Sequence, residues 1–174
     1  MSGSLFRKFL LACGLAGACL SAGAQTAQEH EVKAAFLFRF LSFMEWPQAS
    51  SAPIVIGLVG ADEIAAELER LVPGRTAQGR PVAVRRLKPG ESPAGVHVVM
   101  VGRGEAERIA PLARQGAFVV GESEGALDRG AAINFLVDEG KVRFEVSLPA
   151  AERSKVRISS RMLAVAQSVR GAKP

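Results

Sequence analysis

Residues 33–47 read KAAFLFRFLSFMEWP, the most aromatic stretch of the chain, with four of its nine phenylalanines and its single tryptophan. The composition of residues 29–46 favours a helix, because Ala, Leu, Met, Glu and Lys are good helix formers. Pro47 and the Ser/Ala/Pro run behind it are expected to end this helix. On a helical wheel its apolar arc is far wider than the roughly 100° stripe of a one-sided surface helix. We therefore expect the helix to lie deep in a groove, against the sheet and the C-terminal segment.

Part of this helix is also a candidate interaction surface. Phe38 lies in the middle of the narrow polar gap of the wheel, and Lys33 interrupts the apolar arc. A Phe or Trp left exposed beside an apolar stripe is a typical interface anchor. The candidate partner contacts in this segment are Phe38, Arg39, Glu45, Trp46 and Pro47.

The first 24 residues have the features of a cleaved secretion signal. A short basic start precedes the apolar run FLLACGLAGACL, and residues 22–24 read AGA, which fits the small-x-small cleavage rule. The run is shorter than the roughly 20 apolar residues of a membrane-spanning helix. We expect cleavage between Ala24 and Gln25, export to the periplasm, and one mature domain of residues 25–174. Lipidation of Cys19 is the alternative at this end.

Composition excludes several function classes for that mature domain. Both cysteines, Cys13 and Cys19, precede the expected cleavage site, so the domain has no disulfide, no Cys metal site and no Cys nucleophile. The net charge of the whole chain is +5, but its basic residues are scattered. Nucleic-acid binding normally needs a basic stripe with interleaved aromatics, so we expect no nucleic-acid partner.

Strands and helices alternate behind the aromatic helix. Short apolar runs predict strands at residues 54–60, 81–87, 96–102 and 117–121, with helices at 61–72 and 105–115 between them. Residues 131–148 predict a β-hairpin that turns at residues 138–140, and residues 159–170 predict a final helix capped by Ser159 or Ser160. This order predicts a three-layer α/β sandwich: a mixed sheet of about five to six strands with helices on both faces.

The sequence offers little for catalysis. His30 and His97 are far apart, and neither a zinc motif nor a nucleophile motif occurs. A Gly102-x-Gly104 pair follows a strand and precedes a helix, as in dinucleotide-binding loops, but Glu107 occupies the third glycine position, where it would repel a phosphate. We therefore predict no enzyme activity, no cofactor and no metal.

Polar side chains of the hairpin and of the last helix are further candidates. Arg143 and Glu145 are expected on one strand face, with Asn134 in the preceding strand. Arg161, at the start of the last helix, could reach a carboxylate such as Glu145. We assign Arg143, Glu145 and Arg161 to the candidate partner contacts.

Four segments together resemble the YfiR family of small periplasmic proteins: VKAAFLFRFLSFMEWP (32–47), GAAINF (130–135), KVRFEVS (141–147) and VRISSRMLAVA (156–166). The best-understood member is a periplasmic repressor that binds the periplasmic sensor segment of an inner-membrane diguanylate cyclase. Its release raises cyclic di-GMP and favours biofilm formation. The resemblance implies a mixed α/β fold, a protein partner in place of catalysis, and a tendency to form homodimers.

Two departures from the family pattern bear on mechanism. Family repressors often carry disulfides, which the domain from residue 25 lacks. Where F-E-I-N is expected, the chain has FEVS at residues 144–147, so a side-chain amide contact is missing. Alternatives to a cyclase-binding repressor are a regulator of a sensor kinase, a periplasmic small-ligand-binding module, and an enzyme with an unrecognised site.

Overall fold

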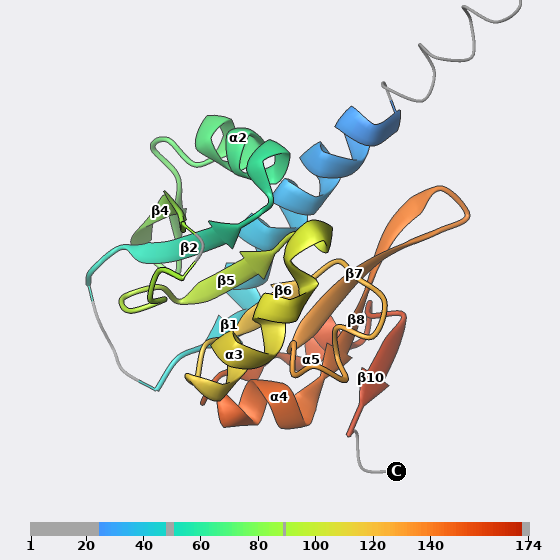
Figure 1. The fold of residues 1–174 in the computed structure, drawn as a ribbon. Helices are drawn as coiled ribbons and strands as arrows, with labels where there is room; N and C mark the ends of the chain where they lie inside the picture. The colour runs from blue at the N-terminus through green and yellow to red at the C-terminus, as the bar shows by residue number, and fades with distance from the viewer. Residues whose placement is uncertain (1–24, 48–50, 89, 172–174) are drawn as a thin grey trace, which may run out of the picture.

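The computed structural model describes residues 25–47, 51–88 and 90–171. The predicted signal segment, residues 1–24, lies outside these ranges. A mixed sheet forms the centre of the molecule (Figure 1), with eight strands in the order β10-β8-β7-β6-β5-β2-β4-β3. Neighbouring strands are parallel except at the pairs β7–β8 and β3–β4. The strand bounds are Thr76–Ala77 (β3), Ile54–Val59 (β2), Arg80–Arg86 (β4), Val98–Val101 (β5), Val119–Gly121 (β6), Ile133–Asp138 (β7), Lys141–Ser147 (β8) and Ser168–Arg170 (β10).

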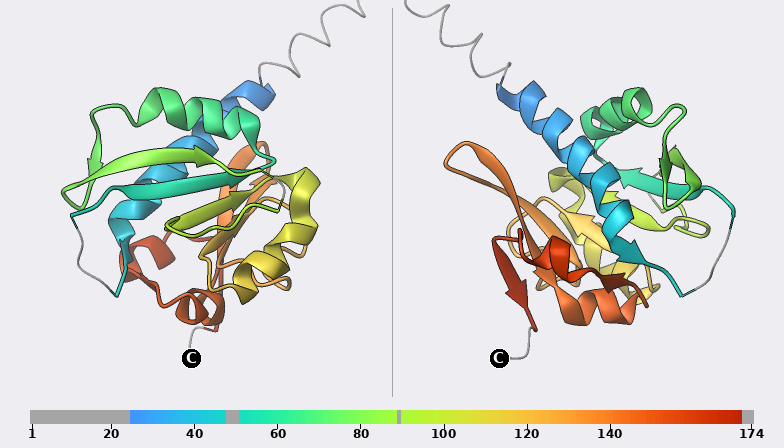
Figure 2. Two further views of the ribbon diagram at one scale, coloured as in Figure 1. Left: turned by 60° about the vertical axis from the view of Figure 1, so that its left-hand side comes forward. Right: turned by 180° about the vertical axis from the view of Figure 1, so that it is seen from behind.

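Helices cover both faces of this sheet (Figure 2), as expected from the sequence. The N-terminal helix, residues 25–40, lies across one face together with α2 (Asp62–Leu71), and the main hydrophobic core is between them and the sheet. The other face carries η2 (Arg103–Arg108) and α3 (Ile109–Arg114) over a smaller core. The three-layer α/β fold is confirmed. The sheet is wider than the expected five to six strands because β3 and β10 are short edge strands.

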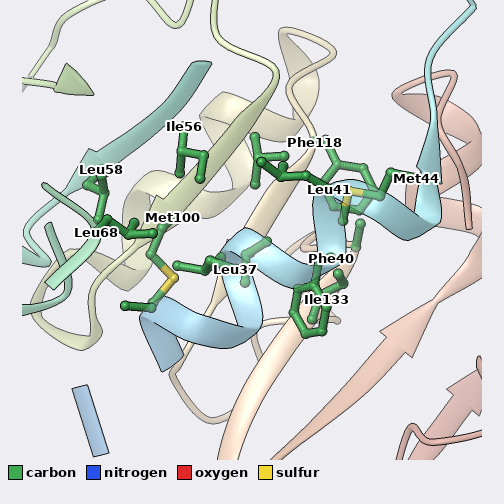
Figure 3. Packing of buried hydrophobic residues seen from close by; sticks show 14 of the residues in the cluster. Leu37, Phe40, Leu41, Met44, Ile56, Leu58, Leu68, Met100, Phe118 and Ile133 are labelled. Atoms are coloured by element: carbon green, nitrogen blue, oxygen red, sulfur yellow. The ribbon is translucent and has the colours of Figure 1, made fainter. Parts of the chain in front are cut away.

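The aromatic segment packs into the main core, as predicted, with Phe40 buried and its other four aromatic side chains half-buried. Phe40 is 2% exposed and packs edge-on against Phe144 of β8, with ring centroids 4.9 Å apart. It also stacks on Phe135 of β7 at 5.8 Å. Figure 3 shows side chains of the N-terminal helix among those of the sheet and α2. Full burial of a large apolar side chain contributes about 1.5–3 kcal/mol, so this helix is a principal part of the core.

The N-terminal helix ends earlier than the sequence predicts. It tightens into a 3-10 turn, η1 (Leu41–Phe43), and then extends as β1 (Met44–Glu45), which pairs antiparallel with β9 (Arg157–Ile158). The Gln78 side chain donates to the carbonyls of Leu41 and Met44, which satisfies acceptors that a helix end leaves free. The prediction of helix over residues 44–46 is therefore wrong, because pairing with a distant strand replaces helical hydrogen bonds there.

The C-terminal prediction is wrong for most of its length. Helix α4 (Leu148–Arg153) follows β8 without having been predicted, and α5 covers only Ser160–Leu163. Residues 168–170 form β10, whose Val169 pairs with Val146 of β8. The apolar spacing fits a helix, but backbone pairing along the free edge of β8 overrides that local preference. Ser159 does cap α5, accepting from the backbone N–H of Arg161 at 3.2 Å.

Lys33, which interrupts the apolar arc, is a buried cation only 1% exposed. Its ammonium pairs with Glu29 one turn earlier and with Glu122, where Nζ and Oε2 are 2.5 Å apart. Glu122 follows β6 directly, and its Oε1 accepts from the backbone N–H of Arg103 at 3.2 Å. Buried charges require such partners. The ion pair therefore fixes the N-terminal helix to the carboxyl ends of the central strands.

Candidate functional site

Residues 45–47, which we call the EWP corner, lie where β1 ends. Glu45 and Arg157 form an ion pair on its surface, with Oε2 and Nη2 2.9 Å apart and side chains 66% and 85% exposed. Pro47 is exposed and Trp46 is half-buried. The Trp46 ring meets His97 edge-on, with centroids 5.6 Å apart. The structure thus brings three predicted contact residues together as one surface feature.

A cavity of about 360 Å³ lies beside Trp46. Arg80, the first residue of β4, is in its wall and is only 9% exposed. Its Nε donates to the Ala52 carbonyl at 2.6 Å and its Nη2 to the Pro53 carbonyl at 3.5 Å. Both acceptors are neutral, and within residues 25–47, 51–88 and 90–171 Arg80 forms no ion pair.

His97 lies directly against Arg80, with Nε2 and Nη2 3.0 Å apart. Its Nδ1 accepts from the backbone N–H of Val55 at 3.2 Å. Desolvation, and secondly the charge of Arg80, lower the pKa of His97 from its ordinary 6.5. The ring is therefore neutral at pH 7, and its proton is on Nε2 because Nδ1 acts as the acceptor.

His97 is thus held by a hydrogen bond from Val55 and by its contact with Arg80, but it is half-buried in a cavity wall. The strand expected from residue 96 begins only at Val98, so His97 precedes β5 and lines the cavity. A second cavity, of about 310 Å³, is lined by Glu152 and Arg157 together with residues of the EWP corner. The two cavities share Trp46, Pro47, Lys155 and Val156 as lining residues, so they adjoin at the corner.

The other predicted contact residues lie elsewhere. Phe38 is half-buried against the main core, and the Arg75 guanidinium carbon is 5.8 Å from its ring centroid. Arg39 is exposed. Arg143 is exposed on β8 and lines a groove between the N-terminal helix and the hairpin. These residues do not form one site with the EWP corner.

The suggested pair between Arg161 and Glu145 is wrong. Glu145 is half-buried, and its carboxylate accepts from Asn134 Nδ2 at 3.1 Å and from Ser168 Oγ at 3.3 Å. Ser168 reaches Glu145 because residues 168–170 form β10 beside β8 in place of the expected helix. Arg161 is exposed and makes no ion pair within the described ranges. Glu145 instead lines a separate cavity of about 470 Å³ with Arg103 and Glu122.

Gly102, the first glycine of the Gly102-x-Gly104 pair, has a packing role. A Cβ added to Gly102 would lie 1.8 Å from the carbonyl oxygen of Gly60, so only glycine allows these two strand ends to approach. The Gly102 N–H donates to the carbonyl of Val59 at 2.8 Å. Gly104 has open space around its Cα. Close packing therefore requires glycine at position 102, whereas nothing in the geometry requires it at position 104.

Membrane spans and metal clusters are both absent from the described residues. No helix in them is both long and apolar enough to cross a bilayer. No group of three or more His, Cys, Asp or Glu side chains in the same residues could hold a metal ion.

Sequence reasoning missed Arg80, which it placed at the end of a loop. An Arg beside a proline at a strand start is common on surfaces, and nothing in the local pattern reveals its burial. The informative sign is the pairing of β2 with β4 in the sheet: Ile54 is opposite Val82. This register brings Arg80 beside the residues that precede β2, and their carbonyls are its acceptors.

Comparison with known proteins adds the following. No curated protein matches the chain. One solved structure, a conserved domain protein from Vibrio cholerae, is 18% identical with a TM-score of 0.47, and the match covers 67% of this chain. The matched region is about half, 54%, of that protein. A family model described as YfiR/HmsC-like matches residues 30–167, so the chain belongs to the YfiR/HmsC-like family of regulatory proteins, as the resemblance predicts.

Proposed function

We propose that this protein is a periplasmic repressor that binds the periplasmic segment of an inner-membrane signalling protein and holds it inactive. Membership of the YfiR/HmsC-like family over residues 30–167 supports a regulatory role. A diguanylate cyclase is the proposed partner, so the protein would limit cyclic di-GMP and biofilm formation. The export features of residues 1–24 support the periplasmic location.

We assign the partner surface to the EWP corner. Glu45 and Arg157 form an exposed ion pair beside Trp46 and Pro47, a combination of an aromatic ring, a proline and a polar rim. Interface hot spots are enriched in Trp and Arg and are surrounded by polar rim contacts. Trp46 and Pro47 also line both of the cavities that adjoin the corner.

The first test is capture of the partner. The tagged protein is expressed in its own host, recovered from solubilised membranes, and its bound proteins are identified by mass spectrometry. Recovery of one membrane cyclase or kinase supports the proposal. If a strain with its native set of membrane proteins yields nothing above background, the repressor proposal is rejected.

The second test locates the interface. Reversing the charge with Arg157→Glu should weaken capture at least about tenfold, since a like charge then faces Glu45 and the rim charge is inverted. The matched control is Glu67→Lys, which reverses one member of the Arg70–Glu67 pair on α2. Equal capture by both variants would locate the interface away from the corner.

Phe38 remains a separate predicted anchor. Because its ring packs partly against the main core, Phe38→Glu tests two roles at once. A folded variant that no longer represses would support the anchor role. A large loss in unfolding temperature would assign Phe38 to the core instead.

A further inference from the structure

The ionisable side chains that line the cavity beside Trp46 are all basic. The ionisable side chains in its wall are Arg80, His97 and Lys155, with no carboxylate among its lining residues. His97 is neutral, so the cavity carries two formal positive charges. Apolar side chains complete the wall, including Val96, Phe118 and Val156.

Arg80 is the central observation. A buried charge is normally paired, because desolvation without a counter-charge costs several kcal/mol. Arg80 is about nine-tenths buried, yet its acceptors are two backbone carbonyls. The other buried cation of the described residues, Lys33, has two carboxylate partners. Arg80 is therefore a buried guanidinium in a cavity wall with no carboxylate partner among the described residues, which makes it a candidate anion-binding group.

The contact between Arg80 and His97 supports the same conclusion. Nδ1 of the neutral ring accepts a hydrogen bond from the backbone N–H of Val55, so the ring proton is on Nε2. Nε2–H and the Nη2 group of Arg80 are then two donors only 3.0 Å apart, with no acceptor between them. An oxygen anion within hydrogen-bond distance of both atoms would accept from each and remove this donor–donor repulsion.

The ring of Trp46 lines this cavity, but its indole N–H is buried away from it. Its Nε1 is buried and has no hydrogen-bond partner among the described residues. Buried N–H groups without acceptors are rare in folded proteins and cost about 1–3 kcal/mol each. The donors of the proposed site are therefore those of Arg80 and His97.

We propose that this cavity binds a small organic acid, with one carboxylate held by Arg80 and His97 and an apolar body against Val96, Phe118 and Val156. The planar guanidinium fork suits the two oxygens of a carboxylate. A volume of about 360 Å³ is within the roughly 300–1,000 Å³ range of small-ligand sites. The exposed ammonium of Lys155 adds charge attraction at the rim. This inference concerns ligand binding alone and does not depend on the repressor proposal.

The chain contains one tryptophan, so its fluorescence reports on this cavity directly. Cyclohexanecarboxylate is a suitable probe, because it does not absorb where Trp46 is excited. The purified protein is titrated with it at pH 7, and the emission of Trp46 is followed. The matched neutral probe is cyclohexanecarboxamide, and inorganic phosphate tests binding of an anion without an apolar body.

We expect a saturable change in Trp46 emission with the carboxylate, at least about tenfold weaker binding of the amide, and no saturation with phosphate. Arg80→Gln should weaken carboxylate binding at least about tenfold, whereas Arg86→Gln, on the same strand but paired with Glu69 and Asp62, should leave it unchanged. Lys155→Asn should weaken it about two- to threefold, and Asn tolerates the left-handed backbone that Lys155 adopts there.

The proposal is overturned if the carboxylate gives no saturable change, if the amide binds equally well, or if a folded Arg80→Gln variant binds unchanged. Saturation by phosphate with the affinity of the carboxylate would overturn the organic-acid assignment and leave a general anion site. Should Arg80→Gln fail to fold, the amide comparison and the Lys155→Asn variant decide the question. Capture of a membrane partner is a separate measurement, so failure of one proposal is distinguishable from failure of the other.

Discussion

Lys33 and Arg80 are both buried cations, 1% and 9% exposed, but their surroundings differ. The Lys33 ammonium is held between the carboxylates of Glu29 and Glu122 and joins the N-terminal helix to the end of β6. Among the described residues, the polar partners of the Arg80 guanidinium are carbonyls and a neutral imidazole, at the wall of a cavity. Lys33 has its counter-charges within the fold, whereas Arg80 can still pair with an anion from solution. The first arrangement predicts a role in stability, and the second predicts a role in binding.

The largest expected effect is the loss of the internal ion pair. Glu122→Ala leaves a buried ammonium with Glu29 as its remaining carboxylate and also frees the backbone N–H of Arg103. Breaking a buried pair costs about 3 kcal/mol or more. Urea unfolding should therefore show a loss of about 3 kcal/mol in the free energy of unfolding.

The control for that variant is Glu67→Ala, which breaks the exposed pair with Arg70 and should change stability by less than about 0.5 kcal/mol. The double variant Lys33→Met with Glu122→Gln should regain part of the loss, because no unpaired charge remains buried. A loss below about 1 kcal/mol for Glu122→Ala would contradict the structural role of Lys33.

Arg80→Gln should have a smaller effect on stability in the absence of ligand. The substitution loses hydrogen bonds to the Ala52 and Pro53 carbonyls, but it also removes a desolvated charge and the donor conflict with His97. These contributions oppose each other, so we expect a change within about 1 kcal/mol. Measuring it beside Glu122→Ala, by the same urea titration, compares the two cations directly. A loss as large as that of Glu122→Ala would make Arg80 structural.

The parallel half of the fold follows from the sequence because its signals are local. Apolar runs bounded by glycine and proline define β2, β4, β5 and β6, and α2 carries acidic residues in its first turn. The hairpin turn is equally local: Glu139 and Gly140 both have positive φ, 48° and 73°, which suits a tight β-hairpin. These elements were predicted with small errors at their ends.

The elements that sequence reasoning missed depend on contacts between distant residues. Glu45 pairs with Arg157 across β1 and β9, and Val169 pairs with Val146 across β10 and β8. Two- and three-residue strands have no periodicity of their own, so only their partners define them. Lys33 has one partner close in the sequence and one far from it. Glu29 precedes Lys33 by one helical turn, whereas Glu122 is 89 residues away from it. The burial of Arg80 was missed for the same reason, because it depends on the pairing of β4 with β2.

His97 gives a test in which pH is the variable. Its folded pKa is lowered by desolvation and by Arg80, so the unfolded chain takes up a proton more readily than the folded protein does. Its contribution to stability is therefore intact above about pH 6.5 and is lost as the pH falls through the folded pKa. Protonation would also require Nδ1 to give up the N–H of Val55.

We expect the wild-type protein to lose more stability than His97→Gln between pH 7.5 and pH 5, as measured by urea unfolding at each pH. His30 is present in both proteins, so the difference between them isolates His97. Parallel pH profiles would show that the surroundings of His97 do not favour its neutral form, and the donor assignment at Nε2 would fail with them.

The smallest expected effect on stability concerns the surface ion pair of the EWP corner. Glu45 and Arg157 are 66% and 85% exposed, and pairs of this kind contribute at most about 1 kcal/mol. Glu45→Gln should therefore change the free energy of unfolding by less than about 0.5 kcal/mol, while it removes a charge from the proposed partner surface. Because the fold does not need this pair, a clear loss of membrane-partner capture by Glu45→Gln would locate the interface at the corner. Unchanged capture would exclude the corner from the partner surface. It would not affect the role of Lys33 in stability or the proposed role of Arg80 in ligand binding.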